Sequence, residues 1–157
     1  MKLEKRTILI TGGTSGIGLE LAKQLLQRGN TVIITGRDQE KLDAAKRAMP
    51  GIHTFKSDVS DPAAIAALYG SVVAQFPALD TLINNAGVMR NLNLSQPRDL
   101  NDVTREIEIN LNGPVRMVQQ FLPHLKTRKG ALIVNVSSGL AFIPFPCLLY
   151  TSDAADE

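Results

Sequence analysis

Short apolar runs alternate along the chain with longer segments of helical period. The runs are rich in Ile, Val and Thr, and each is short enough to be a buried strand. Because helical segments stand between them, the pattern is typical of βαβ units stacked around a parallel sheet. It predicts an α/β fold with a doubly wound parallel sheet that ends, within this sequence, after its fifth strand. The predicted strands are Thr7–Thr11, Thr31–Thr35, Ile52–Lys56, Leu79–Ile83 and Ala131–Val136.

Four helices are predicted between these strands, and local signals mark their ends. Asp38 and Asp61 are suited to cap helix N-termini, and Pro62 fits the first helical position. Pro114 and Pro123 lie inside the last helical segment, so we expect a kink or break near each one. The predicted helices are Ile17–Gln27, a helix capped by Asp38 that runs to Met49, Pro62–Phe76 and Asp99–Lys126.

Composition narrows the classes of partner. With 157 residues, 44% of them hydrophobic, the chain can bury a core, and its net charge of +2 is spread without a basic run, so we expect no nucleic-acid partner. The apolar run behind the charged start is only Ile8–Ile10, so we expect no membrane partner and a cytoplasmic location. Cys147 stands alone and His53 lies far from His124, so no metal site is expected.

The strongest chemical signal is the first strand-to-helix turn, which reads Thr11-Gly12-Gly13-Thr14-Ser15-Gly16-Ile17-Gly18. Glycines let a backbone turn sharply and approach a pyrophosphate, while the N–H groups of the helix that opens near Gly16 point at the anion. The glycine spacing differs from that of the common dinucleotide fingerprint, and the lysine of a P-loop is missing. The turn therefore predicts a nucleotide site; the alternative is a tight loop without a ligand.

This turn resembles the signature of the short-chain dehydrogenase/reductase family, and three further motifs follow in the family's order. They are Asp58-Val59 after the third strand, Asn84-Asn85-Ala86-Gly87 after the fourth and Asn135-Val136-Ser137-Ser138 at the end of the fifth. The stretch 137–144 is most similar to a poorly characterised bacterial subgroup, which indicates no substrate. The resemblance implies a Rossmann-like fold, an oxidoreductase that transfers hydride between a nicotinamide and a small alcohol or carbonyl substrate, and a homo-oligomeric parent protein.

The resemblance also implies which residues bind the cofactor. Asp58 should accept a hydrogen bond from the adenine amino group beside Val59; the alternative is a strand-end aspartate that caps its own turn. The asparagine motif should tie neighbouring strands together and leave room for the ribose. The residues expected to bind cofactor are Gly12, Thr14, Ser15, Gly16, Ile17, Gly18, Arg37, Asp58, Val59, Asn85, Ala86, Gly87 and Ile109.

The choice of cofactor depends on the end of the second strand. NAD enzymes usually carry an acidic residue there, but this chain has Gly36 followed by Arg37, whose guanidinium can grip a 2′-phosphate. Asp38 dilutes that positive charge, and neither Thr14 nor Ser15 supplies a second cation. We therefore predict NADP, with NAD left open and a solvated loop arginine as the alternative.

Catalysis in the family uses Asn, Ser, Tyr and Lys. At the matching positions the resemblance implies Ser138 as the catalytic serine, beside Ser137, and Asn110 as the catalytic asparagine. The alternative for Asn110 is a polar residue at a helix kink ahead of Pro114. Tyr150 follows Ser138 by 12 residues, close to the family's interval, yet no lysine occurs after Lys129.

The end of the sequence explains this departure. The eleven residues Cys147–Glu157 agree with the translation of a transposon adapter used in sequencing libraries, so we interpret them as a non-native tail and Tyr150 as a coincidence. Residues 1–146 are then an incomplete dinucleotide-binding domain, and we expect this chain to be inactive by itself. A non-catalytic dinucleotide-binding module is the alternative function.

Overall fold

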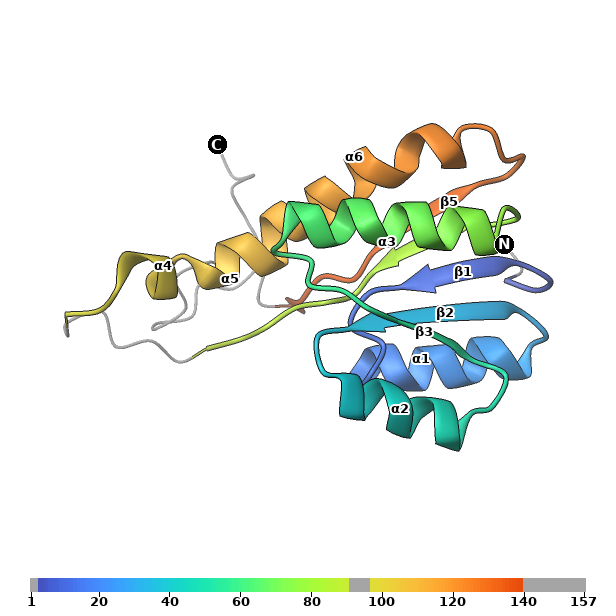
Figure 1. Ribbon diagram of the computed structural model, residues 1–157, viewed down its shortest axis with the longest axis horizontal. Coiled ribbons are helices and arrows are strands. Elements are labelled where there is room, and N and C mark those ends of the chain that lie inside the picture. Colours follow the sequence, from blue (N-terminus) through green and yellow to red (C-terminus); the bar gives the residue numbers. More distant parts are fainter. Residues whose placement is uncertain (1–2, 91–96, 140–157) are drawn as a thin grey trace.

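A computed structural model describes residues 3–90 and 97–139, which form one parallel sheet with helices on both faces (Figure 1). The strand order is β3-β2-β1-β4-β5, so the chain builds one half of the sheet outward from β1 and then returns to β1 to build the other. The predicted doubly wound α/β fold is confirmed, and so is each predicted strand, with ends that shift by one or two residues. The strands are β1 Thr7–Ile10, β2 Thr31–Gly36, β3 His53–Lys56, β4 Thr81–Asn84 and β5 Leu132–Asn135.

Side chains on the central strands alternate between two apolar layers. Ile8 and Ile10 pack on the face covered by α1 (Gly16–Gln27) and α2 (Gln39–Ala48). Leu9 packs on the face covered by α3 (Pro62–Gln75) and α6 (Gly113–Leu125). Successive side chains of a strand point to opposite faces, and a parallel sheet buries both of them. This is why these strands read as continuous apolar runs in the sequence.

The first three helices confirm the predicted caps. The Asp38 carboxylate accepts a hydrogen bond from the Lys41 N–H at 3.3 Å, and that of Asp61 accepts one from the Ala63 N–H at 2.8 Å. Each bond satisfies one of the N–H groups that a helix leaves unpaired at its start. These helices are α1 Gly16–Gln27, α2 Gln39–Ala48 and α3 Pro62–Gln75.

The predicted helix Asp99–Lys126 is only partly correct. Asp99 does cap its start, but an unpredicted interruption falls at Thr104, and a π-helical turn lies directly ahead of Pro114. The π turn widens the helix where the proline cannot donate a hydrogen bond. The observed segments are α4 Leu100–Val103, α5 Arg105–Ile107, the π turn η1 Glu108–Asn112 and α6 Gly113–Leu125.

Of the kink or break expected near Pro123, the break is wrong, because α6 continues through Pro123 to Leu125. Pro123 and Gln119 are both exposed. The Gln119 carbonyl, which loses its helical partner to the proline, therefore faces water and can be hydrated. A proline on the solvent side of a helix, close to its end, removes one main-chain hydrogen bond without breaking the helix.

Several sequence-based predictions lie outside the described residues. They concern Tyr150, the tail Cys147–Glu157, the domain boundary at Pro146 and most of the stretch 137–144. In the part of the chain that the structure does describe, no helix has both the length and the apolar character needed to cross a membrane. The same residues contain no cluster of three or more His, Cys, Asp or Glu side chains that could hold a metal ion.

Candidate functional site

A cleft of about 400 Å³ opens beyond the carboxyl ends of the strands, where the connections from β1 reverse direction. Parallel α/β sheets bind ligands at this switch point. Every residue expected from the sequence to bind cofactor lines the cleft, which brings three of the four motifs together with Arg37 and Ile109. Six further residues line it as well: Thr35, Gly36, Asp38, Lys41, Ser57 and Val88.

The floor of the cleft is built from backbone packed on backbone. Gly12 has a φ of +67°, and a Cβ added there would lie 2.8 Å from the Ala86 Cα. A Cβ at Gly18 would lie 2.3 Å from the Asn85 Nδ2 and 2.4 Å from the Gly12 carbonyl oxygen. No side chain fits at either position, so the turn keeps its backbone open to a ligand.

The N-terminus of α1 opens into this space. Ser15 occupies the N-cap but makes no side-chain cap, and the first turn of α1 carries no acidic residue. The first N–H groups of the helix are therefore left for another acceptor, and the helix dipole favours an anion there. Since Ser15, Gly16 and Ile17 all line the cleft, a phosphate fits this position.

Hydrogen bonds fasten the glycine turn to the end of β4. The Thr11 hydroxyl accepts bonds from the Asn85 and Ala86 N–H groups, each at 3.0 Å. The Asn85 side-chain amide donates to the carbonyl oxygens of Thr11 at 3.0 Å and Gly12 at 3.2 Å. The Asn84 amide donates to the Asn135 side chain at 2.9 Å and so ties β4 to β5. The asparagine motif thus joins strands, as predicted, and Asn85 also lines the cleft.

At the β2 end of the cleft, Arg37 and Asp58 form an ion pair with an N–O distance of 3.8 Å. The Asp58 carboxylate also accepts hydrogen bonds from the Ser60 N–H at 2.9 Å and the Ser60 hydroxyl at 2.7 Å. Partial burial acts to raise the pKa of Asp58, but the Ser60 bonds and the charges of Arg37 and Arg105 outweigh burial and lower it. Asp58 therefore caps its own turn and lines the cleft at once.

A second cation, which was not predicted from the sequence, lines the cleft. Lys41 lies in the first turn of α2 and lines the same end of the site as Arg37. The sequence did contain a signal for it. A helix capped by Asp38 has Lys41 in its first turn, next to the loop that carries Arg37. The glycine turn lacks a cation, as noted, but α2 supplies one.

Asn110 lies in the π turn and is held by two hydrogen bonds to one residue. Its Oδ1 accepts from the Val88 N–H at 2.9 Å, and its Nδ2 donates to the Val88 carbonyl at 2.7 Å. Ile109 and Val88 line the cleft, whereas Asn110 and Ser138 are not among the lining residues. Ser138 follows β5, on the edge where Asn135 pairs with Asn84. Both candidate catalytic residues thus lie past the carboxyl end of the sheet.

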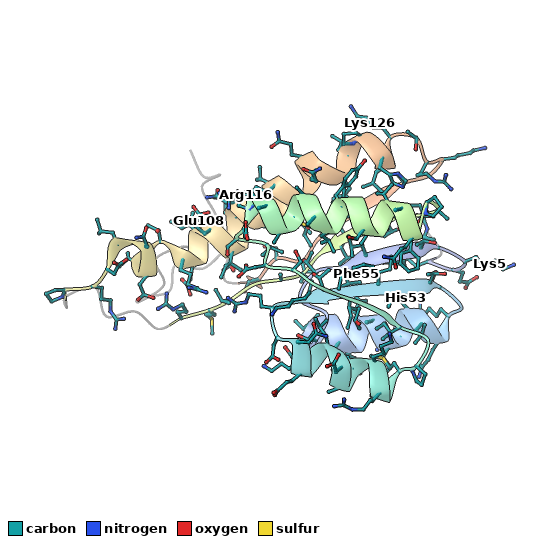
Figure 2. The ribbon with its side chains drawn as sticks, viewed as in Figure 1. Lys5, His53, Phe55, Glu108, Arg116 and Lys126 are labelled. Atoms are coloured by element: carbon teal, nitrogen blue, oxygen red, sulfur yellow. The ribbon has the colours of Figure 1, made fainter. Side chains whose placement is uncertain are left out.

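A second contact joins this helix to the loop that follows β3 (Figure 2). Arg116 pairs with Glu108 at 2.8 Å and donates to the Ser60 carbonyl at 3.2 Å. Hydrogen bonds from Arg116 and Asn112 lower the pKa of the Glu108 carboxyl. The π turn is thereby connected to the loop that positions Asp58.

Comparisons with known proteins agree with this geometry. The family model for short chain dehydrogenases matches residues 6–152. An uncharacterized oxidoreductase, DltE, of Bacillus subtilis (strain 168) is 46% identical over 145 residues, which are 92% of this chain and 58% of that protein. The NADP-dependent 3-hydroxy acid dehydrogenase YdfG of Salmonella typhi is 32% identical, over 88% of this chain and 56% of its own. The solved structure of a short-chain dehydrogenase from Streptomyces avermitilis superposes with a TM-score of 0.82 at 29% identity, over 92% of this chain and 53% of that one. This chain spans little more than half the length of these relatives.

Proposed function

The chain belongs to the short chain dehydrogenase family, and on that premise we propose that the complete protein is an NADP(H)-dependent oxidoreductase acting on an alcohol or carbonyl substrate. The observation that carries the proposal is the cleft floor at Gly12 and Gly18, where any side chain would collide with neighbouring atoms. Such a bare backbone beside an open helix N-terminus fits a dinucleotide pyrophosphate. The cytoplasmic location and the homo-oligomeric state stay predictions.

The proposed cofactor site has two ends. Asp58 and Val59 would hold the adenine, while Asn85, Ala86 and Gly87 would border the ribose on the nicotinamide side. The bound nicotinamide would supply hydride transfer. At the other end of the cofactor, Arg37 and Lys41, which both line the cleft, would face the 2′-phosphate.

These two cations favour NADP over NAD. A guanidinium and an ammonium on one wall of the cleft provide charge-assisted hydrogen bonds to a phosphate. Gly36, in place of an acidic residue, leaves the ribose hydroxyls without a carboxylate acceptor at that position. The relative YdfG is named as NADP-dependent, which agrees with this preference.

For catalysis we propose two of this chain's residues. Ser138 would donate a hydrogen bond to the substrate oxygen, and Asn110 would keep the helix and the segment at Val88 in position at the nicotinamide end. The general acid/base would come from a tyrosine and a lysine of the complete protein, because a phenol with an ordinary pKa of about 10 needs a nearby cation to act near neutrality.

The experiment is a titration of the complete protein with NADPH and NADH, followed by turnover assays with small carbonyl compounds. We expect tighter binding of NADPH, turnover by the wild type, and loss of most turnover but not of binding in Ser138→Ala. A protein that binds neither dinucleotide would contradict the proposal. Binding without turnover by the wild type would favour the alternative, a non-catalytic dinucleotide-binding module.

A further inference from the structure

We infer that Glu106 is a positioning residue for the nicotinamide end of the cleft, which it controls by fixing the extended segment Val88–Arg90. The inference rests on the proposed function. Glu106 lies in α5, four residues before Asn110, and is only 2% exposed. It touches neither the cleft nor its ligands, so its effect is transmitted through the backbone of this segment.

Two side chains of one helix hold the segment. The Glu106 carboxylate accepts a hydrogen bond from the Arg90 N–H. The Asn110 amide bonds both the N–H and the carbonyl of Val88. In an extended chain the N–H groups of alternate residues point to the same side. The helix thus supplies to Val88 and Arg90 the hydrogen bonds that a neighbouring strand would otherwise make.

The side chain of Arg90 anchors the far end of the segment to the same helical region. Its guanidinium donates to the Asp102 carbonyl and to the Asp102 carboxylate, both at 2.7 Å. The Arg90 guanidinium is therefore paired with Asp102, and only the Arg90 backbone N–H donates to Glu106. The role of Glu106 is that of a hydrogen-bond acceptor for main chain rather than that of an ion-pair partner for Arg90.

A buried carboxylate is costly unless it is hydrogen-bonded, so an apolar residue would be the simpler choice if this position only filled space. Removing the acceptor would leave the half-buried Arg90 N–H without this partner, and the segment would shift away from the helix. Val88 lines the cleft beside Ile109, whereas Arg37, Lys41 and Asp58 lie at the other end. Loss of the Glu106 hydrogen bond should therefore weaken the contacts to the nicotinamide end of the cofactor and leave those to the adenosine end unchanged.

The contributions of the two ends of the cleft can be distinguished by comparing the binding of two ligands. NADPH engages the whole cleft, while 2′,5′-ADP carries only the adenine and the two phosphates of the adenosine end. The dissociation constant of 2′,5′-ADP divided by that of NADPH measures what the nicotinamide end contributes to binding. In the complete protein we expect Glu106→Ala to lower this ratio about tenfold. The affinity for 2′,5′-ADP should not change. The turnover number kcat should fall together with the ratio.

Conservative and neighbouring variants complete the test. Glu106→Gln keeps a carbonyl oxygen at the same reach and should restore the ratio to within about twofold of the wild type. Glu20→Ala, which changes an exposed glutamate of α1 outside the cleft, should leave the ratio unchanged. If Glu106→Ala does not fold, Glu106→Asp, which is one methylene shorter, should show the same selective loss.

Three results would overturn the inference. They are an unchanged ratio in Glu106→Ala, a parallel loss of affinity for both ligands in the folded variant, and a Glu106→Gln variant as impaired as Glu106→Ala. A wild type that binds neither ligand is a different outcome, because it would remove the proposed function itself.

Discussion

At the scale of single residues, the end of the cleft beside β2 balances two cations against two carboxylates. Arg37 and Lys41 face Asp38 and Asp58, and Arg37 is already paired with Asp58 at 3.8 Å. A 2′-phosphate entering this end has to share Arg37 with Asp58. Lys41 adds a cation for which no ion pair is found among the described residues.

The first prediction concerns this balance. In the complete protein, Lys41→Ala should weaken NADPH binding about tenfold and leave NADH binding nearly unchanged, because only NADPH carries the 2′-phosphate. Arg37→Asp should reverse the preference between the two. The control is Lys46→Ala, on α2 but outside the cleft, and calorimetric titration is the measurement. Equal loss of both affinities in Lys41→Ala would contradict the assignment.

The second prediction is a pH dependence at Asp58. Its pKa is lowered in the folded protein, so its contribution to stability is present above the ordinary carboxyl pKa of about 4 and is lost as the pH falls through the folded value. The wild type should exceed Asp58→Asn in free energy of unfolding at pH 7. Urea denaturation should show this difference shrinking as the pH is lowered below about 4. A difference that stays constant or grows on acidification would be inconsistent with the Ser60 and Arg37 contacts.

At the scale of elements, the strand-to-helix turn and α3 use glycine in opposite ways. Gly18 is closed in by Asn85 and Gly12, whereas a Cβ at Gly70, on the exposed side of α3, would meet no atom within 4 Å. Gly18 is required because Asn85 and Gly12 approach it closely. Gly70 only adds conformational freedom to the helix.

The third prediction follows from this contrast. Gly18→Ala should destabilise the protein and abolish dinucleotide binding, because the turn has to move to admit the methyl group. Gly70→Ala should raise the free energy of unfolding by about 0.5–1 kcal/mol and leave binding intact. Thermal melts and an NADPH titration of both variants provide the measurement. If Gly18→Ala bound NADPH as the wild type does, the cleft floor would not be the pyrophosphate site.

The elements differ in how far the sequence predicts them. Strands and the first three helices could be predicted because their ends depend on local signals, such as the caps at Asp38 and Asp61. Between Asp99 and Lys126 the cap and the helix could be predicted, but the interruption at Thr104 and the π turn could not. The π turn is held by hydrogen bonds between Asn110 and Val88, which lie 22 residues apart in sequence. The motifs of the cleft were visible because each follows a strand. Lys41 was missed because its role depends on how α2 docks.

At the scale of the whole molecule, β5 is an edge of the described sheet. It pairs with β4 alone, and its three apolar residues are only half-buried, whereas all four residues of β4 are buried. Exposed apolar edges promote association between chains. The relatives continue well beyond the length of this chain.

The fourth prediction is therefore that the 157-residue chain, expressed by itself, self-associates or melts without cooperativity. Size-exclusion chromatography and thermal melts, run beside a full-length relative, are the measurements. A monodisperse monomer with a cooperative transition would show that β5 needs no further partner.

The fifth prediction concerns activity of the same chain. The sequence has no lysine after Lys129, so Tyr150 is not followed by the lysine with which the family's catalytic tyrosine acts, and we expect no NADP(H)-dependent turnover. Tyr150→Phe should change nothing. Turnover that disappears in Tyr150→Phe would contradict the interpretation of the tail.

The strand order also dictates when each pairing becomes possible during synthesis. The contacts that bring β1 and β2 together span 24 residues, as between Arg6 and Asn30, whereas those that join β1 to β4 span 72, as between Thr11 and Ile83. Loop closure over the longer span costs more entropy and slows folding. On the ribosome, β1 can pair with β2 long before β4 has emerged. The cofactor cleft, which lies between β1 and β4, is therefore completed only when the second half of the sheet arrives.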